Sequence, residues 1–426
     1  MIGIVADDTT GANDIGLMFS KNQYTVKILT FHEELILGDK PDVLIIDTDS
    51  RLDSGEDSYQ KVYMATEKLE ELGCAHFFNK TCSVFRGNIG EEFDAMLDAL
   101  NEDFAVISLA FPKNGRKTIN GIHTVYGKRL ENSEFANDPV HPMVDSNLVR
   151  ILEKQTSRKV SLITLDVVRK GPDVLRSEIE KHRESSNYCI IDSETQDDLR
   201  IVAEAVHDLK ILCGSSAIAE ELPSFLKIEP VPNPLKEINI TDENGVLIVS
   251  GSLTPQTHAQ TRHLIEQKTP SVILDSRFIF SPEERAKEIQ RMIHEVEVLI
   301  KLGTDVLVMA DNRKEVVLET KEMGRKLGEN DLHTSKMVSQ ALAEVVEKVI
   351  DHTGVKRLVV AGGDTSGTVC RRLGITGNYV LEEIETGLPS GYAFGRNMLI
   401  VLKSGSFGKE DFLKKAVDHL KRLTAG

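Results

Sequence analysis

Short runs of aliphatic and β-branched residues alternate with longer amphipathic stretches along the chain, and this alternation limits the fold more than any other feature. In the first half the short runs include "IGIVA", "VLIID", "HFFNK", "FAVIS", "VSLIT", "YCIID" and "KILCG". In the second half they include "GVLIVSG", "SVILD", "DVLVM", "KRLVVAGG" and "MLIVLKSG". Stretches between them, such as "GEDSYQKVYMATEKLEELG" and "TSKMVSQALAEVVEKVIDHTG", have the spacing of amphipathic helices. The alternation predicts an α/β fold of largely parallel sheets flanked by helices.

The chain is long enough for two such structures. Its 426 residues exceed what one hydrophobic core usually holds. Residues 226–245, "LKIEPVPNPLKEINITDENG", contain three prolines within five positions. Because proline lacks a backbone donor and fixes φ, this stretch cannot extend either sheet. We therefore predict a crossing near residues 228–243 between a domain of residues 1–228 and a domain of residues 243–426.

Composition excludes several classes of function. The net charge of −16 argues against nucleic-acid binding, which needs clustered lysine and arginine. It also means that an anionic ligand must be met by local cations. The apolar runs are too short to span a bilayer, and "MIGIVADD" has no signal-peptide pattern, so we expect a cytoplasmic protein without a membrane partner. The five scattered cysteines fit reduced thiols.

An unusual concentration of polar side chains follows the first expected strand. Asp7, Asp8, Asn13 and Asp14 lie within eight positions of one another in "ADDTTGAND". One or two of them could cap the next helix. Ligands of open parallel sheets bind where strands end in loops, so the surplus favours contact with a hydroxylated substrate or a metal.

Two further loops of the first half carry cations. Arg51 in "IDTDSRLD" suits a bidentate grip on a carboxylate or phosphate, although a surface ion pair explains it equally well. Lys80 and Arg86 bracket a short polar loop before "GNIGEE", which makes an anion site plausible. The nearby "GIHTVYGKR" only superficially matches a P-loop. Its glycines are one residue too far apart, and Arg129 stands where a hydroxyl should bind magnesium, so we reject it.

Three turns of the second half share a design of small residues between a strand and a helix. They lie in "VVAGGDTSGTVCRRLGI", "VSGSLTPQT" and "LKSGSFGKEDF". Glycine permits close backbone approach, and the amides of a helix N-terminus attract phosphate oxygens. A tight turn with an aspartate cap is the structural alternative for the first. Together the turns predict a nucleotide site made of Gly362, Gly363, Asp364, Thr365, Ser252, Thr254 and Gly405.

At this point the chain resembles the four-carbon acid sugar kinases. The resemblance runs in order over essentially the whole chain, through "IVADDTTGANDIG", "DSR", "FRGNIGEE", "FPKNGRKTINGIHTV", "SGSLTPQT", "GGDTSGTVCRRLGI" and "KSGSFG". It implies that ATP and Mg²⁺ serve to phosphorylate the terminal hydroxyl of D-threonate, D-erythronate or 3-oxo-tetronate. It also implies an N-terminal domain for the sugar acid, a C-terminal domain for the nucleotide, and an active site in the cleft between them.

The resemblance also implies residue roles. Asp8 would be the catalytic residue beside the attacking hydroxyl. The sugar-acid site would comprise Asp7, Asn13, Asp14, Arg51, Lys80, Ser83, Val84, Phe85 and Arg86. Members of the family commonly have aspartate and threonine where this chain has Cys82 and Val84, which leaves the identity of the acid open. The magnesium ligands and the oligomeric state are not given by the sequence, and a homodimer is one candidate.

Two alternatives belong to other functional classes. A two-domain Rossmann-like NAD-dependent dehydrogenase fits the alternation of strands and helices, but the glycine fingerprint of dinucleotide binding is missing. A non-catalytic protein that binds sugar acids would also have two α/β domains, but it would not need a separate phosphate cradle.

Overall fold

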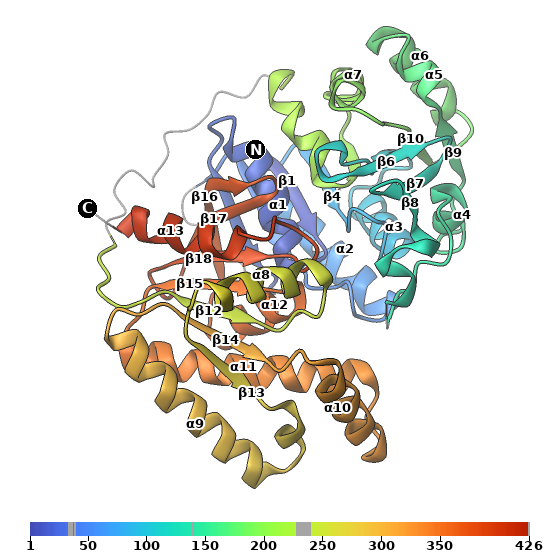
Figure 1. Cartoon of the computed structure of the whole chain (residues 1–426). Helices are drawn as coiled ribbons and strands as arrows, with labels where there is room; N and C mark the ends of the chain where they lie inside the picture. Colours follow the sequence, from blue (N-terminus) through green and yellow to red (C-terminus); the bar gives the residue numbers. More distant parts are fainter. Residues whose placement is uncertain (33–36, 38–39, 139, 227–239, 425–426) are drawn as a thin grey trace. The chain divides into compact units, whose positions relative to one another are not determined.

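The computed structural model describes residues 1–32, 37, 40–138, 140–226 and 240–424. The chain divides into two compact units, Met1–Asn233 and Pro234–Gly426. Each unit is an α/β structure in which a largely parallel sheet is flanked by helices, which confirms the predicted fold class (Figure 1). The crossing predicted near residues 228–243 lies mostly outside the described residues.

The sheet of the N-terminal unit is parallel throughout. Its strand order is β2–β3–β1–β4–β11–β5–β10–β9. The central strands β1 and β3 are buried along their whole length, as expected of aliphatic strands covered on both faces. The strand bounds are β1 Ile2–Ala6, β2 Val26–Thr30, β3 Val43–Asp47, β4 His76–Lys80, β5 Ala105–Ser108, β9 Val160–Ile163, β10 Tyr188–Ile191 and β11 Ile211–Gly214.

A small antiparallel sheet accompanies the parallel one. Its strands are β6 (Arg116–Ile119), β7 (Ile122–Val125) and β8 (Lys128–Arg129). The segment "GIHTVYGKR" forms the β7–β8 hairpin, with positive φ at Tyr126 and Gly127. It therefore turns as a hairpin and does not lead into a helix as a phosphate-binding loop would.

Most helices of this unit connect consecutive parallel strands. Their bounds are α1 Thr9–Ser20, α2 Gly55–Glu71, α3 Ile89–Ala99, α4 Leu148–Glu153, α5 Leu165–Val168, α6 Pro172–Arg183 and α7 Gln196–Val206. Short 3₁₀ helices are η1 Pro112–Asn114, η2 Leu130–Asn132, η3 Glu134–Asn137, η4 Ser216–Glu220 and η5 Leu222–Ser224. The crossovers place the loop after each parallel strand at one edge of the sheet.

The C-terminal unit contains the strand order β13–β14–β12–β15–β18–β17–β16. The neighbours β13, β14, β12, β15 and β18 pair in parallel. Strand β17 pairs antiparallel with both β18 and β16. The bounds are β12 Leu247–Ser250, β13 Ser271–Leu274, β14 Val306–Ala310, β15 Arg357–Ala361, β16 Gly377–Glu385, β17 Leu388–Ala393 and β18 Met398–Lys403.

Helices cover this sheet in two sets. Their bounds are α8 Pro255–Glu266, α9 Pro282–Lys301, α10 Lys314–Lys326, α11 Asp331–Thr353, α12 Gly363–Arg372 and α13 Phe412–Thr424, with the 3₁₀ helix η7 at Ser276–Phe280. Helix α11 packs against both α9 and α12, and α13 packs against α8 (Figure 1). The connection from β12 through α8 runs toward β13, whereas the connections through α9, α11 and α12 run in the opposite direction along the sheet. Right-handed crossovers therefore put α8 on one face and α9, α11 and α12 on the other. Aliphatic side chains of β12, β14, β15, α9 and α11 form the core.

The structure also shows the state of the cysteines and whether any described helix could cross a membrane. The cysteines are free thiols, as predicted, and Cys189, Cys213 and Cys370 are buried. None of the helices within the described ranges has both the length and the apolar surface that a bilayer crossing requires.

Candidate active site

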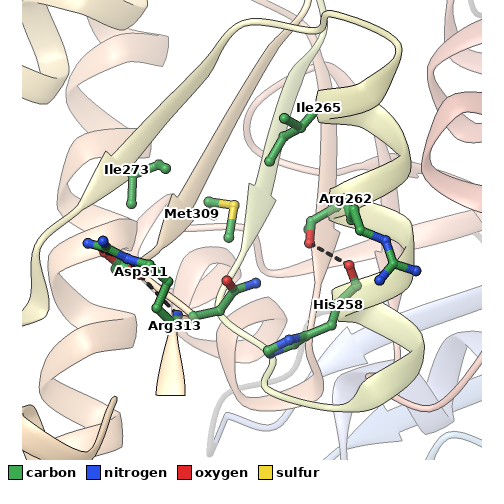
Figure 2. Close-up of a pocket in the computed structure, with 9 residues that line it drawn as sticks. His258, Arg262, Ile265, Ile273, Met309, Asp311 and Arg313 are labelled. Atoms are coloured by element: carbon green, nitrogen blue, oxygen red, sulfur yellow. Dashed lines mark hydrogen bonds and ion pairs between the residues drawn. The ribbon is translucent and has the colours of Figure 1, made fainter. Parts of the chain in front are cut away.

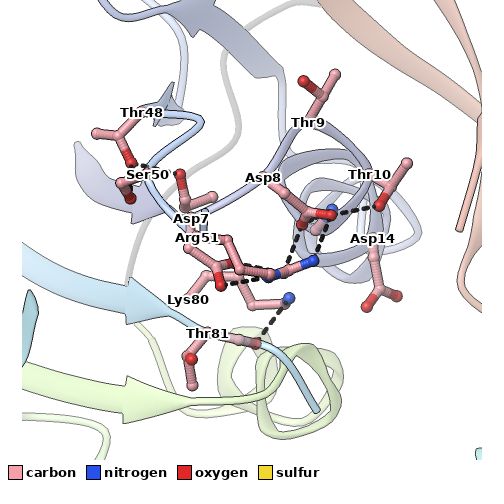
Figure 3. Close-up of polar contacts among 12 residues, drawn as sticks. Asp7, Asp8, Thr9, Thr10, Asp14, Thr48, Ser50, Arg51, Lys80 and Thr81 are labelled. Atoms are coloured by element: carbon pink, nitrogen blue, oxygen red, sulfur yellow. Dashed lines mark hydrogen bonds and ion pairs between the residues drawn. The ribbon is translucent and has the colours of Figure 1, made fainter. Parts of the chain in front are cut away.

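The loops after four neighbouring strands bring polar side chains of the N-terminal unit together. Ala6 of β1 is in register with Asp47 of β3 and with Lys80 of β4, and Lys80 is in register with Gly214 of β11. Because these strands are parallel, the residues that follow them share one edge of the sheet. Figure 3 shows that Asp7, Asp8, Arg51 and Lys80 gather at this edge, close to the start of α1.

Asp8 has a structural role as well as a position in the cluster. It is the N-cap of α1, and its Oδ1 accepts a hydrogen bond of 2.8 Å from the Gly11 backbone N–H. The Thr10 hydroxyl donates to its Oδ2 at 2.8 Å. The capping explanation of this aspartate is therefore correct. It does not account for the other carboxylates of the loop.

Arg51 connects Asp7 and Asp8 with four hydrogen bonds. Its Nε and Nη2 donate to the two Asp7 oxygens at 2.8 and 2.7 Å, and its Nη1 and Nη2 donate to the two Asp8 oxygens at 2.7 and 2.8 Å (Figure 3). Burial by itself would raise the pKa of Asp8, but the charges of Arg51 and Lys80 outweigh it and lower that pKa to about 2. Asp8 is therefore an anion at neutral pH.

Lys80 completes the charge balance of this cluster. It is the last residue of β4, is almost fully buried, and donates from Nζ to the Thr81 carbonyl at 3.0 Å. A Cβ atom on Gly11 would lie 2.5 Å from Asp8 Oδ1 and 2.9 Å from Lys80 Nζ. Glycine at this position therefore lets the carboxylate and the ammonium group approach the first turn of α1 closely.

Asp14 differs from Asp8 although both are buried in the same cluster. Its Oδ2 accepts a hydrogen bond of 2.6 Å from the Ser216 hydroxyl, while its Oδ1 is buried without a partner among the described residues. Burial raises the pKa of Asp14 to about 6, and Lys80 and Ser216 only partly oppose this rise. Leaving a buried carboxylate oxygen without a hydrogen bond costs free energy. Asp14 Oδ1 is therefore well suited to accept a hydrogen bond from a hydroxyl of a bound ligand.

The loop of residues 82–86 places its predicted side chains in different environments. Val84 and Phe85 are fully buried, and the Phe85 ring lies 6.0 Å from the Phe93 ring, so only their backbone could contact a ligand. Arg86 forms an ion pair of 2.6 Å with Asp138. The Ser83 carbonyl lies 3.0 Å from His123 Nε2.

Asn13 and Cys82 also lie near the cluster. Asn13 is buried on α1 and donates from Nδ2 to the Thr9 carbonyl at 2.9 Å. Burial alone would raise the pKa of the Cys82 thiol, but the charges of Arg51 and Arg86 bring it below its usual range.

Sequence reasoning missed two buried carboxylates beneath the cluster. Asp47, at the end of β3, accepts a hydrogen bond of 2.5 Å from the Thr9 hydroxyl, and burial together with Asp49 raises its pKa. Glu92 of α3 accepts hydrogen bonds of 2.7 Å from both Ser50 and Ser58, and burial together with Asp7 raises its pKa. Asp47 lies in the segment that contains Arg51, and Glu92 lies in the helix that follows Arg86. Nothing local marks either carboxylate as part of a site, and only the strand order brings them to this edge.

The three small-residue turns of the C-terminal unit converge. The Thr254 hydroxyl donates to the Gly405 carbonyl at 2.6 Å, and it lies 3.0 Å from the Ser252 hydroxyl. A Cβ atom on Gly251 would lie 2.3 Å from Thr365 Oγ1, and one on Gly362 would lie 3.2 Å from Ser252 Cβ. The turns after β12, β15 and β18 therefore form one crowded cradle in which additional side-chain atoms do not fit.

Topology gives this cradle a particular position. The chain leaves β12 on one side through α8 and returns to the other side of β12 as β15, so the crevice between β12 and β15 is a switch point of the sheet. Helix α12 begins at Gly363, and its N-cap Gly362 makes no side-chain cap bond. Its first backbone donors therefore remain available to phosphate oxygens.

A buried lysine that sequence reasoning missed supports the Gly405 turn. Lys403 Nζ donates to Thr257 Oγ1 at 2.8 Å, to the Ser404 carbonyl at 2.8 Å and to the Gly405 carbonyl at 2.9 Å. Burial lowers its pKa to about 7. It ends the aliphatic strand β18, so no local pattern distinguished it from a residue at the solvent edge.

Two family models match separate parts of the chain. Residues 2–222 match the model of a sugar-binding N-terminal domain, and residues 247–413 match that of a nucleotide-binding C-terminal domain. The 3-oxo-tetronate kinase of Pseudomonas savastanoi pv. phaseolicola is 32% identical over 99% of this chain and 97% of its own length. This chain belongs to the four-carbon acid sugar kinase family. The sugar-acid kinases are phosphotransferases, so the chain is an enzyme of that class.

Further relatives and solved structures place this kinase in the same group. The 3-oxo-tetronate kinase of Haemophilus influenzae is 31% identical over 98% of this chain and 99% of its own length. A crystal structure of a Haemophilus influenzae protein assigned to DUF1537 has a TM-score of 0.73 and 29% identity, and it covers 98% of this chain and 100% of its own. A Salmonella typhimurium LT2 protein, provisionally named a tRNA synthase, has a TM-score of 0.82 and 25% identity, with 98% and 99% covered. These comparisons support neither a dehydrogenase nor a non-catalytic binding protein.

Proposed function

We propose that this kinase transfers the γ-phosphoryl group of ATP to the terminal hydroxyl of a four-carbon sugar acid. The observation that carries the proposal is the convergence of the three small-residue turns on one crevice. Thr254 bonds Ser252 and the Gly405 carbonyl, and a Cβ on Gly362 would lie 3.2 Å from Ser252 Cβ. The names of the relatives favour 3-oxo-tetronate as the acid, and D-threonate and D-erythronate are the other candidates. The domain assignment, the residue roles and the active site between the domains stay predictions.

The nucleotide would occupy the cradle described above. Gly362, Gly363, Asp364 and Thr365 open α12, where backbone N–H groups can meet phosphate oxygens. Mg²⁺ belongs to the proposal as a counter-ion of these phosphates. Among the described residues no group of three carboxylate, imidazole or thiol side chains could hold a metal ion. That finding suits an ion bound largely by phosphate and water.

In the N-terminal unit the proposal gives each charged group a task. Asp7 and Arg51 hold Asp8 in one orientation through the paired hydrogen bonds. Lys80 supplies the local cation that a sugar carboxylate or a transferred phosphoryl group needs in a protein of net charge −16. Asp14 accepts a hydrogen bond from a sugar hydroxyl, and the loop Ser83–Arg86 borders the acid.

Asp8 is proposed as the acceptor of the hydroxyl proton. The bond between the sugar oxygen and the γ-phosphorus forms while the bond between that phosphorus and the bridging oxygen breaks, and ADP leaves. Because the transition state of phosphoryl transfer is loose, the proton departs late and a weakly basic carboxylate is sufficient. Alignment of the two oxygens then contributes more to the rate than the basicity of Asp8.

The test is a panel of four-carbon sugar acids with MgATP, with ADP release measured and the product analysed by mass spectrometry and ³¹P NMR. We expect ADP to form in step with at least one acid and the phosphate to lie on the terminal carbon. Asp8→Ala should reduce turnover by at least about 10³-fold and leave ATP binding nearly unchanged. ADP release that is independent of every acid would refute the proposal, and wild-type turnover in Asp8→Ala would remove Asp8 from the chemistry.

A further inference from the structure

The C-terminal unit has a pocket beside the cradle that none of the proposed residue roles uses. It has a volume of about 320 Å³ and is lined by residues of α8, β13, β14 and the loop after β14 (Figure 2). This size lies at the lower end of ordinary small-molecule sites. Its position at the carboxyl ends of parallel strands is where ligands of such sheets bind.

The floor and one wall of the pocket are apolar. Ile273 of β13 is in register with Met309 of β14, so their side chains share one face of the sheet. Ile265 of α8 faces them across the pocket (Figure 2). Ile265 is 42% exposed and Ile273 is 40% exposed, because α8 leaves this part of the sheet face open. The pocket therefore offers an apolar surface that a ring can cover.

The polar rim carries little free charge. Asp311 and Arg313 are paired with each other at 3.0 Å, between Asp311 Oδ1 and Arg313 Nε. Arg262 lies within ion-pair distance of Glu266 and Glu410. This rim is better suited to a neutral ring than to a phosphate.

Two polar groups of the rim are available to a ligand. The side-chain amide of Asn312 has no hydrogen-bond partner among the described residues. The Nε2 atom of His258 is buried and also lacks a partner there. An amide has one acceptor and two donors, and it can pair with adenine at N6 and N7 together.

The pocket and the cradle are adjacent along α8 and along the strand ends. His258 lies one turn, about 5.4 Å, along α8 from Thr254, to whose carbonyl its backbone N–H donates at 3.0 Å. Met309 is in register with Ser250, the residue before the Gly251–Ser252 turn. A molecule with phosphates in the cradle therefore has its other end within reach of the pocket.

We propose that this pocket binds the purine ring of the nucleotide. The ring packs on Ile265, Ile273 and Met309, and the Asn312 amide and His258 pair with its polar edge. This inference rests on the proposed function, because it takes the neighbouring cradle to hold the phosphates. It adds the residues that select the base.

The test compares two probes that share phosphates but not a base. Calorimetry would measure the affinities of ATP and of inorganic tripolyphosphate for the full-length wild type, Asn312→Ala and Ile273→Glu. Both variants should bind ATP roughly tenfold more weakly and tripolyphosphate as well as the wild type does. Asn312→Ala should also reduce the preference for ATP over GTP. Leu302→Glu, at an exposed apolar residue outside the pocket, is the matched control and should leave both affinities unchanged.

The outcomes separate the inference from the proposed function. If the wild type binds ATP and both variants keep its affinity, the base lies elsewhere and the inference is wrong while the kinase proposal stands. If the wild type binds neither ATP nor tripolyphosphate, the proposed function fails and the inference fails with it. Equal melting temperatures of the variants and the wild type, followed by circular dichroism, exclude misfolding as the cause of a loss. Both changes are at partly exposed positions, so the variants should fold. Their two different chemistries test the pocket independently.

Discussion

The pKa values of Asp8, the N-cap of α1, and of Asp14, within α1, are shifted in opposite directions although the two side chains are almost equally buried. Both are less than a tenth exposed. Arg51 contacts Asp8 directly and lowers its pKa to about 2, whereas burial dominates at Asp14 and raises its pKa to about 6. The direction of each shift follows from the partner that the carboxylate reaches, and burial alone would raise both.

The raised pKa of Asp14 predicts a pH-dependent stability. The pKa of Asp14 is 3.8 in the unfolded state and about 6 in the folded state. Between pH 3.8 and pH 6 the folded state therefore holds a proton on Asp14 that the unfolded state has lost. The free energy of unfolding therefore falls as the pH rises through 6. Asp14→Asn removes the buried charge and keeps an acceptor for Ser216. At pH 8 this variant should be more stable than the wild type by about 3 kcal/mol at most, although less active.

Urea unfolding at pH 5, 6.5 and 8 measures this difference. The advantage of the variant should be nearly the same at pH 8 and 6.5 and smaller by about 1 kcal/mol at pH 5, because the proton is taken up below the folded pKa of about 6. An advantage that is the same at every pH would show that the gain comes from packing and not from the charge.

Cys82 predicts a selective chemical modification. Arg51 and Arg86 bring the pKa of its thiol below the usual range. Burial raises the pKa of Cys74 and Cys189 to about 12, and it raises that of Cys213 as well. The thiolate is the reactive form. Limited iodoacetamide at pH 7.5 should therefore alkylate Cys82 first and reduce kinase activity, as followed by peptide mass spectrometry and turnover. Cys82→Ser should resist inactivation, and equal labelling of Cys74 and Cys82 would contradict the prediction.

At the scale of elements, strand ends determine where the cradle of small-residue turns lies. Three turns that are far apart in sequence meet because β12, β15 and β18 are neighbours in parallel register. Lys403 fastens the last turn from inside the sheet with three hydrogen bonds. A buried lysine without a carboxylate partner has a lowered pKa, and here its donors are used on hydroxyl and carbonyl oxygens.

The crowding at Gly251 predicts a loss of nucleotide binding on the smallest possible substitution. A Cβ at this position would lie 2.3 Å from Thr365 Oγ1, so Gly251→Ala must displace the buried Thr365 side chain in the first turn of α12. We expect ATP affinity to fall by at least roughly tenfold, measured by calorimetry. Gly374→Ala is the control, because Gly374 has positive φ but no atom near its Cβ position. It should lose about 1 kcal/mol of stability and keep ATP affinity. Unchanged ATP affinity in Gly251→Ala would argue against the cradle.

At the scale of the whole molecule, the two polar sites belong to different units of the chain. The acid cluster lies within Met1–Asn233 and the cradle within Pro234–Gly426. Each site is built from its own sheet edge and its own loops. A substitution in one site should therefore change the affinity of one ligand only.

This separation predicts a crossed pattern of binding in full-length variants. Asp8→Ala should weaken binding of the preferred sugar acid and keep ATP affinity. Gly251→Ala should weaken ATP binding and keep the affinity for the acid, and both should lose turnover. Equilibrium binding of each ligand by each variant measures the pattern. Loss of both affinities in either variant, with an unchanged melting temperature, would show that the sites are not independent.

Strand ends and loop composition were sufficient to predict most of the candidate site. Asp7, Asp8, Arg51 and Lys80 could be selected because polar residues after a buried strand are expected at one edge of a parallel sheet. The small-residue turns around Gly251, Gly362 and Gly405 could be selected for the same reason. The β16–β17 hairpin was not foreseen, because its partly exposed strands lack the long aliphatic run of a central strand.

The sequence by itself determined the α/β class and the loops in which polar residues collect. These depend on periodicity and on the chemistry of short segments, which are local properties. Only the tertiary structure decided that Asp47, Glu92, Ser216 and Lys403 belong to the sites, that Arg51 is bonded to two aspartates, and that a pocket lies beside the cradle. These features depend on which strands become neighbours, and burial and charge at a position are sums over neighbours that are distant in sequence.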